Sequence, residues 1–346
     1  MGKYRFGIVG AGLIADFHAA AIGELKRASL GGCYDAVPER AEKFAQKHGC
    51  RVFSTLEEMA HSPGIDILTV ATPSGAHMEP VLAAAEGGKH AICEKPLEVT
   101  LERVDAMIKA HEKAGTQLGG IFQNRFTDAQ APLREAIRSG RFGTITYAGV
   151  YVPWWRSEEY YANSWHGTWK LDGGGALMNQ SCHMVDMLCD LMPPAEAVMA
   201  YAEKAGHPGI ETEDTATAVL RFAGGALGLV YGSSASYPGQ LKRFEISGTR
   251  GTVVYLEDSF SVWQFADERP EDGRIRQRFG RVSGPGSVAD PGNLRHENHA
   301  RNFSAFLDAL DSGTDFVLNG REARKAVALI LAIYESARTH AEVPLK

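Results

Sequence analysis

A glycine-rich segment close to the N-terminus is the feature that most constrains how this chain can fold. It reads Gly10-Ala11-Gly12-Leu13-Ile14-Ala15 and directly follows the apolar run from Tyr4 to Val9. The first glycine permits a tight turn, the second lets a ligand approach the backbone, and the small Ala15 allows close helix–strand packing. A strand, a turn and a helix in this order predict a parallel α/β sheet with a phosphate site at the helix N-terminus. The alternative is a tight turn without a ligand.

The first 120 residues continue the alternation of short apolar runs and amphipathic stretches that is typical of a doubly wound parallel sheet covered by helices. Pro38 to His48 is expected to be helical, because proline stands at its first position and Gly49 just beyond its end. Thr100 to Ala114 is a second expected helix, closed by Gly115. The expected strands are Tyr4–Val9, Ser29–Tyr34, Asp66–Ala71, Lys89–Cys93 and Gln117–Phe122.

After residue 122 the pattern changes to closely spaced strand-like runs, interrupted by a long helical stretch from Ala176 to Leu191. This pattern predicts an α+β domain built on an open, mostly antiparallel sheet, so we expect two domains, 1–122 and 123–346. Ser247 to Gly251 is expected to be a hairpin turn. The strand-like runs are Ile145–Val152, Thr215–Phe222, Leu227–Ser233, Arg243–Ser247 and Thr252–Leu256, and a loop is expected at Gly280–Gly292. Further helices are expected at Pro132–Ser139, His299–Leu310 and Arg321–Arg338, and the sequence leaves open on which domain the last two pack.

Composition excludes several classes of partner. A formal net charge of -6 argues against a nucleic-acid partner, since non-specific binding to phosphates depends on clustered lysine and arginine. The densest basic stretch, Arg274 to Arg281, is interrupted by Gly and Gln and is expected to be a solvated loop or edge strand. No apolar run approaches the roughly 20 residues that span a bilayer.

The N-terminal residues and the cysteines bear on the compartment. The chain begins without the basic start, apolar core and cleavage site of a secretory signal. Its five cysteines are an odd number without scaffold spacing, which suggests reduced thiols. We therefore expect a cytoplasmic protein.

Asp35 follows the second expected strand, where a carboxylate can accept hydrogen bonds from the adenosine ribose hydroxyls of a dinucleotide. This position favours NAD over NADP, because a 2′-phosphate would meet a like charge there. Arg40, one helical turn further on, could compensate that charge, so NADP stays open.

Glu94-Lys95-Pro96 stands at the carboxyl end of the Lys89–Cys93 strand, the edge of a doubly wound sheet where ligands collect. A lysine beside a dinucleotide can hydrogen-bond a substrate hydroxyl and stabilise the developing alkoxide. The alternative is a surface ion pair between Glu94 and Lys95.

Three further motifs give this chain a specific resemblance. Ala71-Thr72-Pro73-Ser74-Gly75-Ala76-His77, Glu94-Lys95-Pro96, and Gly173-Gly174-Gly175-Ala176-Leu177 running to His183 and Asp186 occur in this order after the glycine fingerprint. In this combination the chain resembles the Gfo/Idh/MocA family, named for glucose-fructose oxidoreductase and inositol dehydrogenase. The resemblance implies an N-terminal Rossmann domain, a C-terminal α+β domain with a large open sheet, and homodimers or homotetramers formed through that sheet.

The same resemblance implies a cis Lys95–Pro96 bond and a dinucleotide site at which Thr72 and Pro73 line the ribose. The residues expected to hold the cofactor are Gly10, Gly12, Leu13, Ile14, Asp35, Arg40, Thr72, Pro73, His77, Glu94 and Lys95.

In such proteins the histidine that matches His183 is the acid or base for the substrate hydroxyl, and an Asp often stands four residues earlier. This chain has Asn179 there, which shares a helix face with His183 but cannot accept a proton. The acid/base role is therefore expected of His183, with Lys95 assisting and Asn179 orienting substrate or imidazole. The alternative is a buried histidine satisfied by Asp186, which could otherwise anchor the helix.

Aromatic and polar residues before the triple glycine resemble the branch of the family that acts on sugars, nucleotide-sugar acids or cyclitols. Trp154, Trp155, Tyr160, Tyr161, Trp165 and Trp169 can stack on a sugar ring, although such residues also serve core packing. The expected substrate-binding set is Lys95, Arg156, Trp165, His166, Asn179 and His183. Arg125 can neutralise a carboxylate or form a structural ion pair.

The chain is therefore expected to transfer a hydride between nicotinamide and a hydroxyl-bearing carbon of a sugar, sugar derivative or cyclitol. One rival is a sugar-responsive regulator that binds dinucleotide without turnover; the presence of Lys95 and His183 counts against it.

A second rival is a zinc enzyme with His183, Cys182, Asp186 or Cys189 as ligands. Consecutive helical residues point about 100° apart and cannot easily share one ion, so no metal is expected. A hydrolase is set aside, because no Gly-x-Ser-x-Gly elbow occurs where a strand meets a helix.

Overall fold

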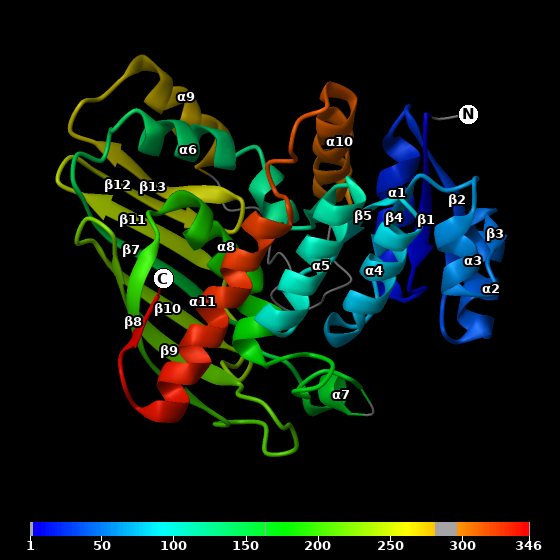
Figure 1. Cartoon of the computed structure of the whole chain (residues 1–346). Coiled ribbons are helices and arrows are strands. Elements are labelled where there is room, and N and C mark those ends of the chain that lie inside the picture. The colour runs from blue at the N-terminus through cyan, green and yellow to red at the C-terminus, as the bar shows by residue number, and fades with distance from the viewer. Residues whose placement is uncertain (1–2, 163, 281–295, 346) are drawn as a thin grey trace. The chain divides into compact units, whose positions relative to one another are not determined.

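The structure is a computed structural model that describes residues 3–162, 164–280 and 296–345 (Figure 1). The chain forms two compact units, the first from residues 1–123 and 295–327 and the second from 124–294 and 328–346. Each unit has its own sheet and its own core. None of the described helices is long and apolar enough to cross a bilayer.

Unit 1 is a six-stranded parallel sheet with the strand order β3-β2-β1-β4-β5-β6, which confirms the doubly wound Rossmann topology expected from the sequence. The strands are β1 (Tyr4–Val9), β2 (Ala28–Tyr34), β3 (Arg51–Val52), β4 (Ile67–Val70), β5 (His90–Cys93) and β6 (Leu118–Gly120). The helices between them are α1 (Leu13–Glu24), α2 (Pro38–His48), α3 (Leu56–His61), α4 (Met78–Glu86) and α5 (Leu101–Ala114). Among the strands of this sheet, the sequence missed the two-residue β3, and it expected helices between the strands without giving bounds for α3 and α4.

Local chemistry sets the helix ends as expected. α2 has proline in its first turn and ends at Gly49, which adopts the left-handed conformation with φ 65°. The Thr100 side chain caps α5 by accepting a hydrogen bond from the Arg103 backbone N–H, and the helix ends at Gly115 with φ 66°.

Helix α10 (Glu297–Ser312) belongs to unit 1, whereas the sequence drew one boundary at residue 122 and left open on which domain this helix packs. Its apolar face explains the difference, because α10 packs on α1 and its Phe303 ring lies 5.6 Å from that of Phe6 in β1. Phe306 crowds Gly119 in β6, where a Cβ would lie 3.0 Å from its ring. The chain thus returns to complete the core of the first sheet.

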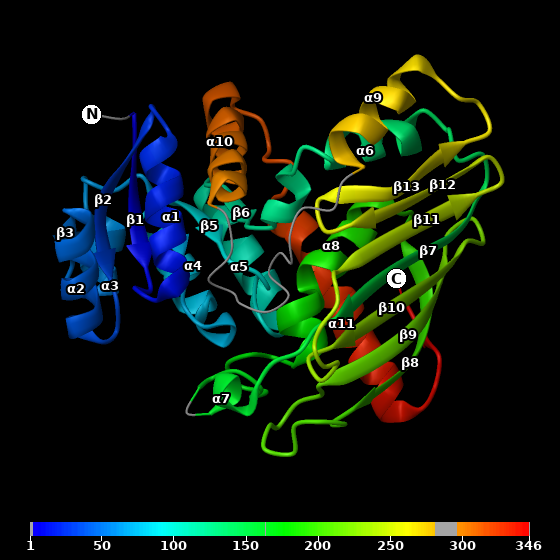
Figure 2. The same ribbon diagram turned by 180° about the vertical axis from the view of Figure 1, so that it is seen from behind.

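Unit 2 is an eight-stranded mixed sheet with the order β13-β12-β11-β7-β10-β9-β8-β14, and the order from β13 to β8 can be followed in Figure 2. Only the β7–β10 pair is parallel. The strands are β7 (Ile145–Pro153), β8 (Ala195–Glu203), β9 (Thr215–Phe222), β10 (Leu227–Ser233), β11 (Arg243–Gly248), β12 (Gly251–Leu256), β13 (Ser259–Phe265) and β14 (Val343–Pro344). The helices are α6 (Gln130–Arg138), α7 (Glu158–Tyr161), α8 (Cys182–Leu191) and α9 (Pro270–Phe279); α11 (Gly320–Thr339) begins in unit 1 and ends in unit 2.

Three expectations for unit 2 need comment. The hairpin is confirmed, since Gly248 pairs with Gly251 across the turn between β11 and β12. The expected loop or edge strand at Arg274–Arg281 is wrong over the described part, because α9 begins with Pro270 and its start is capped by Asp272, which accepts a hydrogen bond from the Arg269 backbone N–H. The loop expected at Gly280–Gly292 lies, from residue 281 on, outside the described residues.

Candidate functional site

The glycine loop after β1 has the geometry that a dinucleotide site requires. Gly10 adopts φ +91°, and a Cβ there would lie 2.7 Å from the Ala71 carbonyl oxygen, so no other residue fits. Gly12 precedes α1 with nothing within 4 Å of its Cβ position and no side-chain cap on the helix. An anion can therefore approach the first N–H groups of α1 directly. Gly12 and Leu13 are exposed and Ile14 is half-buried.

Asp35 lies beside this loop, where the sequence placed it. Its two carboxylate oxygens accept hydrogen bonds from the backbone N–H groups of Ala11 at 2.7 Å and Val37 at 2.8 Å. These bonds hold the carboxylate at the edge of the glycine loop. Arg40 stands exposed in the first turn of α2.

His77 joins the two loops that follow β4 and β5. Its Nδ1 lies 2.9 Å from the Pro96 carbonyl oxygen and its Nε2 lies 3.0 Å from the Thr72 carbonyl oxygen. Burial lowers the pKa of His77, and a neutral imidazole has one N–H, so only one of these contacts is a hydrogen bond at a time. Because the ring is buried between backbone groups, its evident role is to hold the loops together. Thr72 and Pro73 are half-buried beside it.

The Lys95–Pro96 bond is cis, as expected, and Lys95 is half-buried. Glu94 is buried, so the surface ion pair weighed above does not describe it. Its carboxylate contacts His18 of α1 and His299 of α10, and it also accepts a hydrogen bond from the Lys95 backbone N–H. The sequence identified Glu94 but gave no signal for the two histidines, which are distant along the chain.

In unit 2 the triple glycine leads into a π-helix, η3 (Ala176–Ser181), which is followed by α8; the sequence predicted one continuous helix over both. Steric crowding, by a side chain at Gly174 and by backbone at Gly175, favours glycine at both positions. A Cβ on Gly174 would lie 2.2 Å from the Tyr334 hydroxyl, and one on Gly175 would lie 1.7 Å from the Glu213 carbonyl oxygen. Asn179 in η3 and His183 in α8 are both half-buried.

Asp172, which sequence reasoning missed, fixes the orientation of Asn179. Its Oδ1 accepts a 2.8 Å hydrogen bond from the Asn179 Nδ2, and its Oδ2 accepts one from the Gly167 backbone N–H. Since an ionised carboxylate only accepts, the Asn179 amide must direct its nitrogen to Asp172 and its Oδ1 elsewhere. The available signal was its place immediately before the triple glycine.

Glu213 is a second buried carboxylate that the sequence did not indicate. It accepts hydrogen bonds from the backbone N–H groups of Gly175 at 2.9 Å and Leu177 at 2.8 Å, and from the Tyr334 hydroxyl at 2.9 Å. Burial raises the pKa of Glu213 to about 7, against the opposing effect of these hydrogen bonds. This side chain secures the start of the helix that carries Asn179.

Arg125 forms the structural ion pair that the sequence left as one alternative. It donates to both oxygens of Asp186, at 2.7 and 2.6 Å, and to Asp190 at 2.9 Å. Burial raises the pKa of Asp186 to about 6, while Arg125 acts in the opposite direction. Asp186 therefore anchors α8, and both its oxygens are engaged by the guanidinium rather than reserved for His183.

Three of the expected substrate residues gather around Tyr160. The His166 ring stacks on Trp165, with 4.1 Å between centroids, and lies 4.4 Å from the Tyr160 ring. The buried Arg156 guanidinium lies 5.5 Å from the Tyr160 centroid. Trp169 is 49% exposed. An aromatic surface with a buried cation suits a sugar ring that carries polar or anionic groups.

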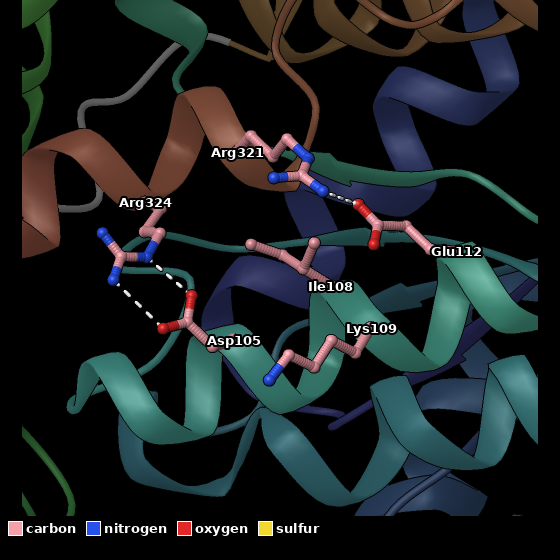
Figure 3. Close-up of a pocket in the computed structure, with 6 residues that line it drawn as sticks. All are labelled: Asp105, Ile108, Lys109, Glu112, Arg321 and Arg324. Atoms are coloured by element: carbon pink, nitrogen blue, oxygen red, sulfur yellow. Dashed lines mark hydrogen bonds and ion pairs between the residues drawn. The ribbon is translucent and has the colours of Figure 1, made fainter.

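Metal-ligating side chains come together elsewhere than the zinc alternative required. Among the described residues, the potential metal ligands whose donor atoms all lie within 4.8 Å of one another are His18, Glu94 and His299 of unit 1. The residues of the zinc alternative around His183, all within the described part of the chain, do not form such a group. A pocket between α5 and α11, also in unit 1, contains none of the expected site residues (Figure 3). Its charges pair internally, Arg324 with Asp105 and Arg321 with Glu112.

The glycine loop, Asp35 and the Rossmann topology define unit 1 as the NAD-binding domain of an oxidoreductase. Comparison with known families agrees: residues 4–121 match the oxidoreductase family with an NAD-binding Rossmann fold, and residues 131–254 match the Gfo/Idh/MocA C-terminal domain. The chain belongs to the Gfo/Idh/MocA family of oxidoreductases.

Relatives cover nearly the whole chain. Myo-inositol 2-dehydrogenase of Thermotoga maritima is 30% identical over 99% of this chain and 98% of its own length. The WlbA dehydrogenase of Bordetella pertussis, solved with NADH and UDP-GlcNAcA, is 35% identical with a TM-score of 0.90 over 100% of this chain and 98% of its own. Levoglucosan dehydrogenase, solved with NADH and levoglucosan, is 25% identical with a TM-score of 0.85 over 99% of both chains.

Proposed function

We propose that this protein is an NAD-dependent dehydrogenase that oxidises a hydroxyl-bearing carbon of a sugar, a sugar derivative or a cyclitol, or reduces the corresponding carbonyl. The observation that carries the proposal is full-length similarity to dehydrogenases of such substrates, combined with the presence of both Lys95 and His183 in their motifs. Arg156 and the aromatic residues around Tyr160 favour a sugar with an anionic group, of which UDP-GlcNAcA in the Bordetella structure is one example.

The residues present fit the cofactor. The open approach at Gly12 suits a pyrophosphate, and Asp35 suits an unphosphorylated ribose, which supports NAD; the exposed Arg40 leaves NADP as the alternative. When bound, the dinucleotide supplies the hydride acceptor and donor.

In the proposed mechanism His183 accepts the proton of the substrate hydroxyl during oxidation and returns it during reduction. The Lys95 ammonium stabilises the alkoxide that forms as the proton leaves. Asn179 presents its Oδ1 as a hydrogen-bond acceptor, because Asp172 holds its amide nitrogen. Asn179 thus orients a substrate hydroxyl or the His183 ring without taking a proton.

The test is a turnover assay with purified protein, NAD and a panel of myo-inositol, levoglucosan and UDP-GlcNAcA, in which the absorbance of the reduced cofactor is followed. Lys95→Ala and His183→Ala should each lower kcat by about 100-fold or more, the scale of general acid–base catalysis. Lys109→Ala and His61→Ala are matched controls, since both side chains are exposed in unit 1 outside the motifs.

Near-wild-type turnover in both site variants would refute the mechanism. The sugar-responsive regulator is the alternative from another class, and its signature would be tight NADH binding together with no turnover of any panel member.

A further inference from the structure

We propose that His18 and His299 are positioning residues that hold Lys95 in place through the Glu94 carboxylate. The inference rests on the proposed function, because it assigns Lys95 a role in the reaction. It concerns three side chains of unit 1 that come from three separate elements: α1, the end of β5, and α10.

The geometry makes Glu94 a bridge between two imidazoles and one peptide group. Its Oε1 lies 3.0 Å from the Nε2 of His18 and 3.5 Å from the Nε2 of His299. Its Oε2 accepts a 3.1 Å hydrogen bond from the Lys95 backbone N–H. The carboxylate therefore ties the peptide that carries Lys95 to both helices.

The protonation states are consistent with this bridge. An ionised carboxylate only accepts, so the His18 Nε2 must carry the hydrogen, which leaves its Nδ1 to accept from the Thr69 hydroxyl at 3.0 Å. Burial lowers the pKa of His18, which keeps the ring neutral with a single N–H. Burial alone would raise the pKa of Glu94, but the hydrogen bond from His18 and the nearby His299 ring outweigh it and hold that pKa well below its usual range.

The surroundings keep the bridge rigid. His18 is 0% exposed, His299 1% and Glu94 7%, so water does not compete for the carboxylate. The Phe303 ring meets His18 edge-on, with centroids 5.3 Å apart. Because α1 also begins at the glycine loop, the bridge fixes Lys95 relative to the helix on which the cofactor pyrophosphate is proposed to rest.

Removal of either imidazole should loosen the Lys95 peptide and lower kcat without removing any contact to substrate. A displacement of about 1 Å can reduce a rate by about 100-fold, so we expect a 10- to 100-fold loss of kcat in His18→Leu. The dissociation constant for NADH should change by less than about 3-fold. His18→Gln retains an N–H donor and should recover part of the lost rate.

His111→Leu is the matched control, because His111 is another buried unit 1 imidazole, bonded to Thr116 and to the Val81 carbonyl rather than to Glu94. It should leave kcat within about 2-fold. In a Lys95→Ala background the His18→Leu substitution should have no further effect on turnover, since both act on the same group. His299→Leu should lower kcat in the same direction but by less than His18→Leu, since its Nε2 lies 3.5 Å from the Glu94 carboxylate rather than 3.0 Å.

A measurement without turnover separates this inference from the proposed function. Hydrogen exchange of the Lys95 amide, followed by mass spectrometry of the peptide that contains it, should be at least about 10-fold faster in His18→Leu and Glu94→Gln than in wild type or His111→Leu. If Lys95→Ala retains full activity but exchange accelerates, the proposed function fails and the bridge stands. Four results would each overturn the inference. They are an unchanged exchange rate of the Lys95 amide, a loss of kcat in His18→Leu no larger than that in His111→Leu, additive effects of His18→Leu and Lys95→Ala on turnover, and a stoichiometric metal ion bound by His18, Glu94 and His299.

Discussion

Replacement of Glu213 by Gln tests the electrostatics of the helix start that carries Asn179. Glutamine keeps one acceptor oxygen and places an NH₂ group where the second oxygen met a backbone N–H. One buried N–H of Gly175 or Leu177 then lacks an acceptor, which costs about 1–3 kcal/mol. At pH 5 the wild-type carboxyl is protonated, but its hydroxyl oxygen can still accept an N–H, which the glutamine NH₂ cannot, so we expect Glu213→Gln to lower the free energy of unfolding by about 2 kcal/mol.

The penalty should shrink as pH rises. Glu213 has its pKa raised from 4.5 to about 7 in the folded protein, so its contribution to stability is full below pH 4.5 and is lost as pH rises through about 7. Relative to its value at low pH, the free energy of unfolding of the wild type should fall, by the linkage relation, by about 1 kcal/mol at pH 5 and by about 3 kcal/mol at pH 8. The glutamine variant does not titrate, so its disadvantage should disappear or reverse near pH 8.

Urea denaturation followed by tryptophan fluorescence is the suitable assay, because all five tryptophans belong to the segment 124–294 of unit 2. Glu196→Gln, at an exposed position in β8, is the matched control and should stay within about 0.5 kcal/mol of wild type at both pH values. A penalty for Glu213→Gln that is equal at pH 5 and pH 8, or that grows with pH, would refute the assigned direction of the pKa shift.

Three further predictions concern the cofactor, acid stability and assembly. Asp35→Ala should raise the ratio of NADP to NAD use by at least about 10-fold in steady-state kinetics, and an unchanged ratio would contradict the assignment. Burial lowers the pKa of His111 from 6.5 to about 4, so unit 1 should be about 3 kcal/mol less stable at pH 4 than at pH 7. Hydrogen exchange should show that His111→Asn loses less stability than wild type between pH 7 and pH 4. One face of the unit 2 sheet exposes the apolar side chains of Tyr201, Val219 and Leu227, at 62%, 54% and 60%, and we expect homodimers or homotetramers to form through it. Leu227→Arg should therefore produce smaller species than wild type in sedimentation analysis. A wild-type protein that sediments as a monomer would contradict this prediction.

The sequence predicted the Rossmann domain closely because its signals are local. Gly10, Gly12 and Gly49 each serve a turn or helix end that one or two neighbouring residues determine. It missed β8, whose alanine-rich sequence has low strand propensity and is held by pairing with β9. It left open on which unit α10 packs, because an amphipathic helix does not indicate which core it will cover.

The same distinction applies to the candidate site. Lys95, Asn179 and His183 stand in recognisable motifs. The partners of His18, His299 and Glu213, by contrast, lie far away in the chain, whereas Asp172 bonds to residues close to it in sequence. Asp172 offered only its place before the triple glycine as a signal and Glu213 offered none, so their roles emerged from the atoms to which they bond. Hydrogen-bond partners of buried polar groups follow from the tertiary fold, so sequence spacing alone could not identify them.

The late return of the chain to the first sheet has a consequence for biosynthesis. The Rossmann core lacks α10 until the ribosome has passed residue 312, so the whole of the segment 124–294 must be made before the first core can close. Until then the nascent N-terminal sheet leaves the apolar surface around Phe6 and Gly119 uncovered, along with the imidazole of His18. Residues 1–123 produced alone should therefore associate or aggregate, and supplying the α10 sequence as a separate peptide should restore their solubility.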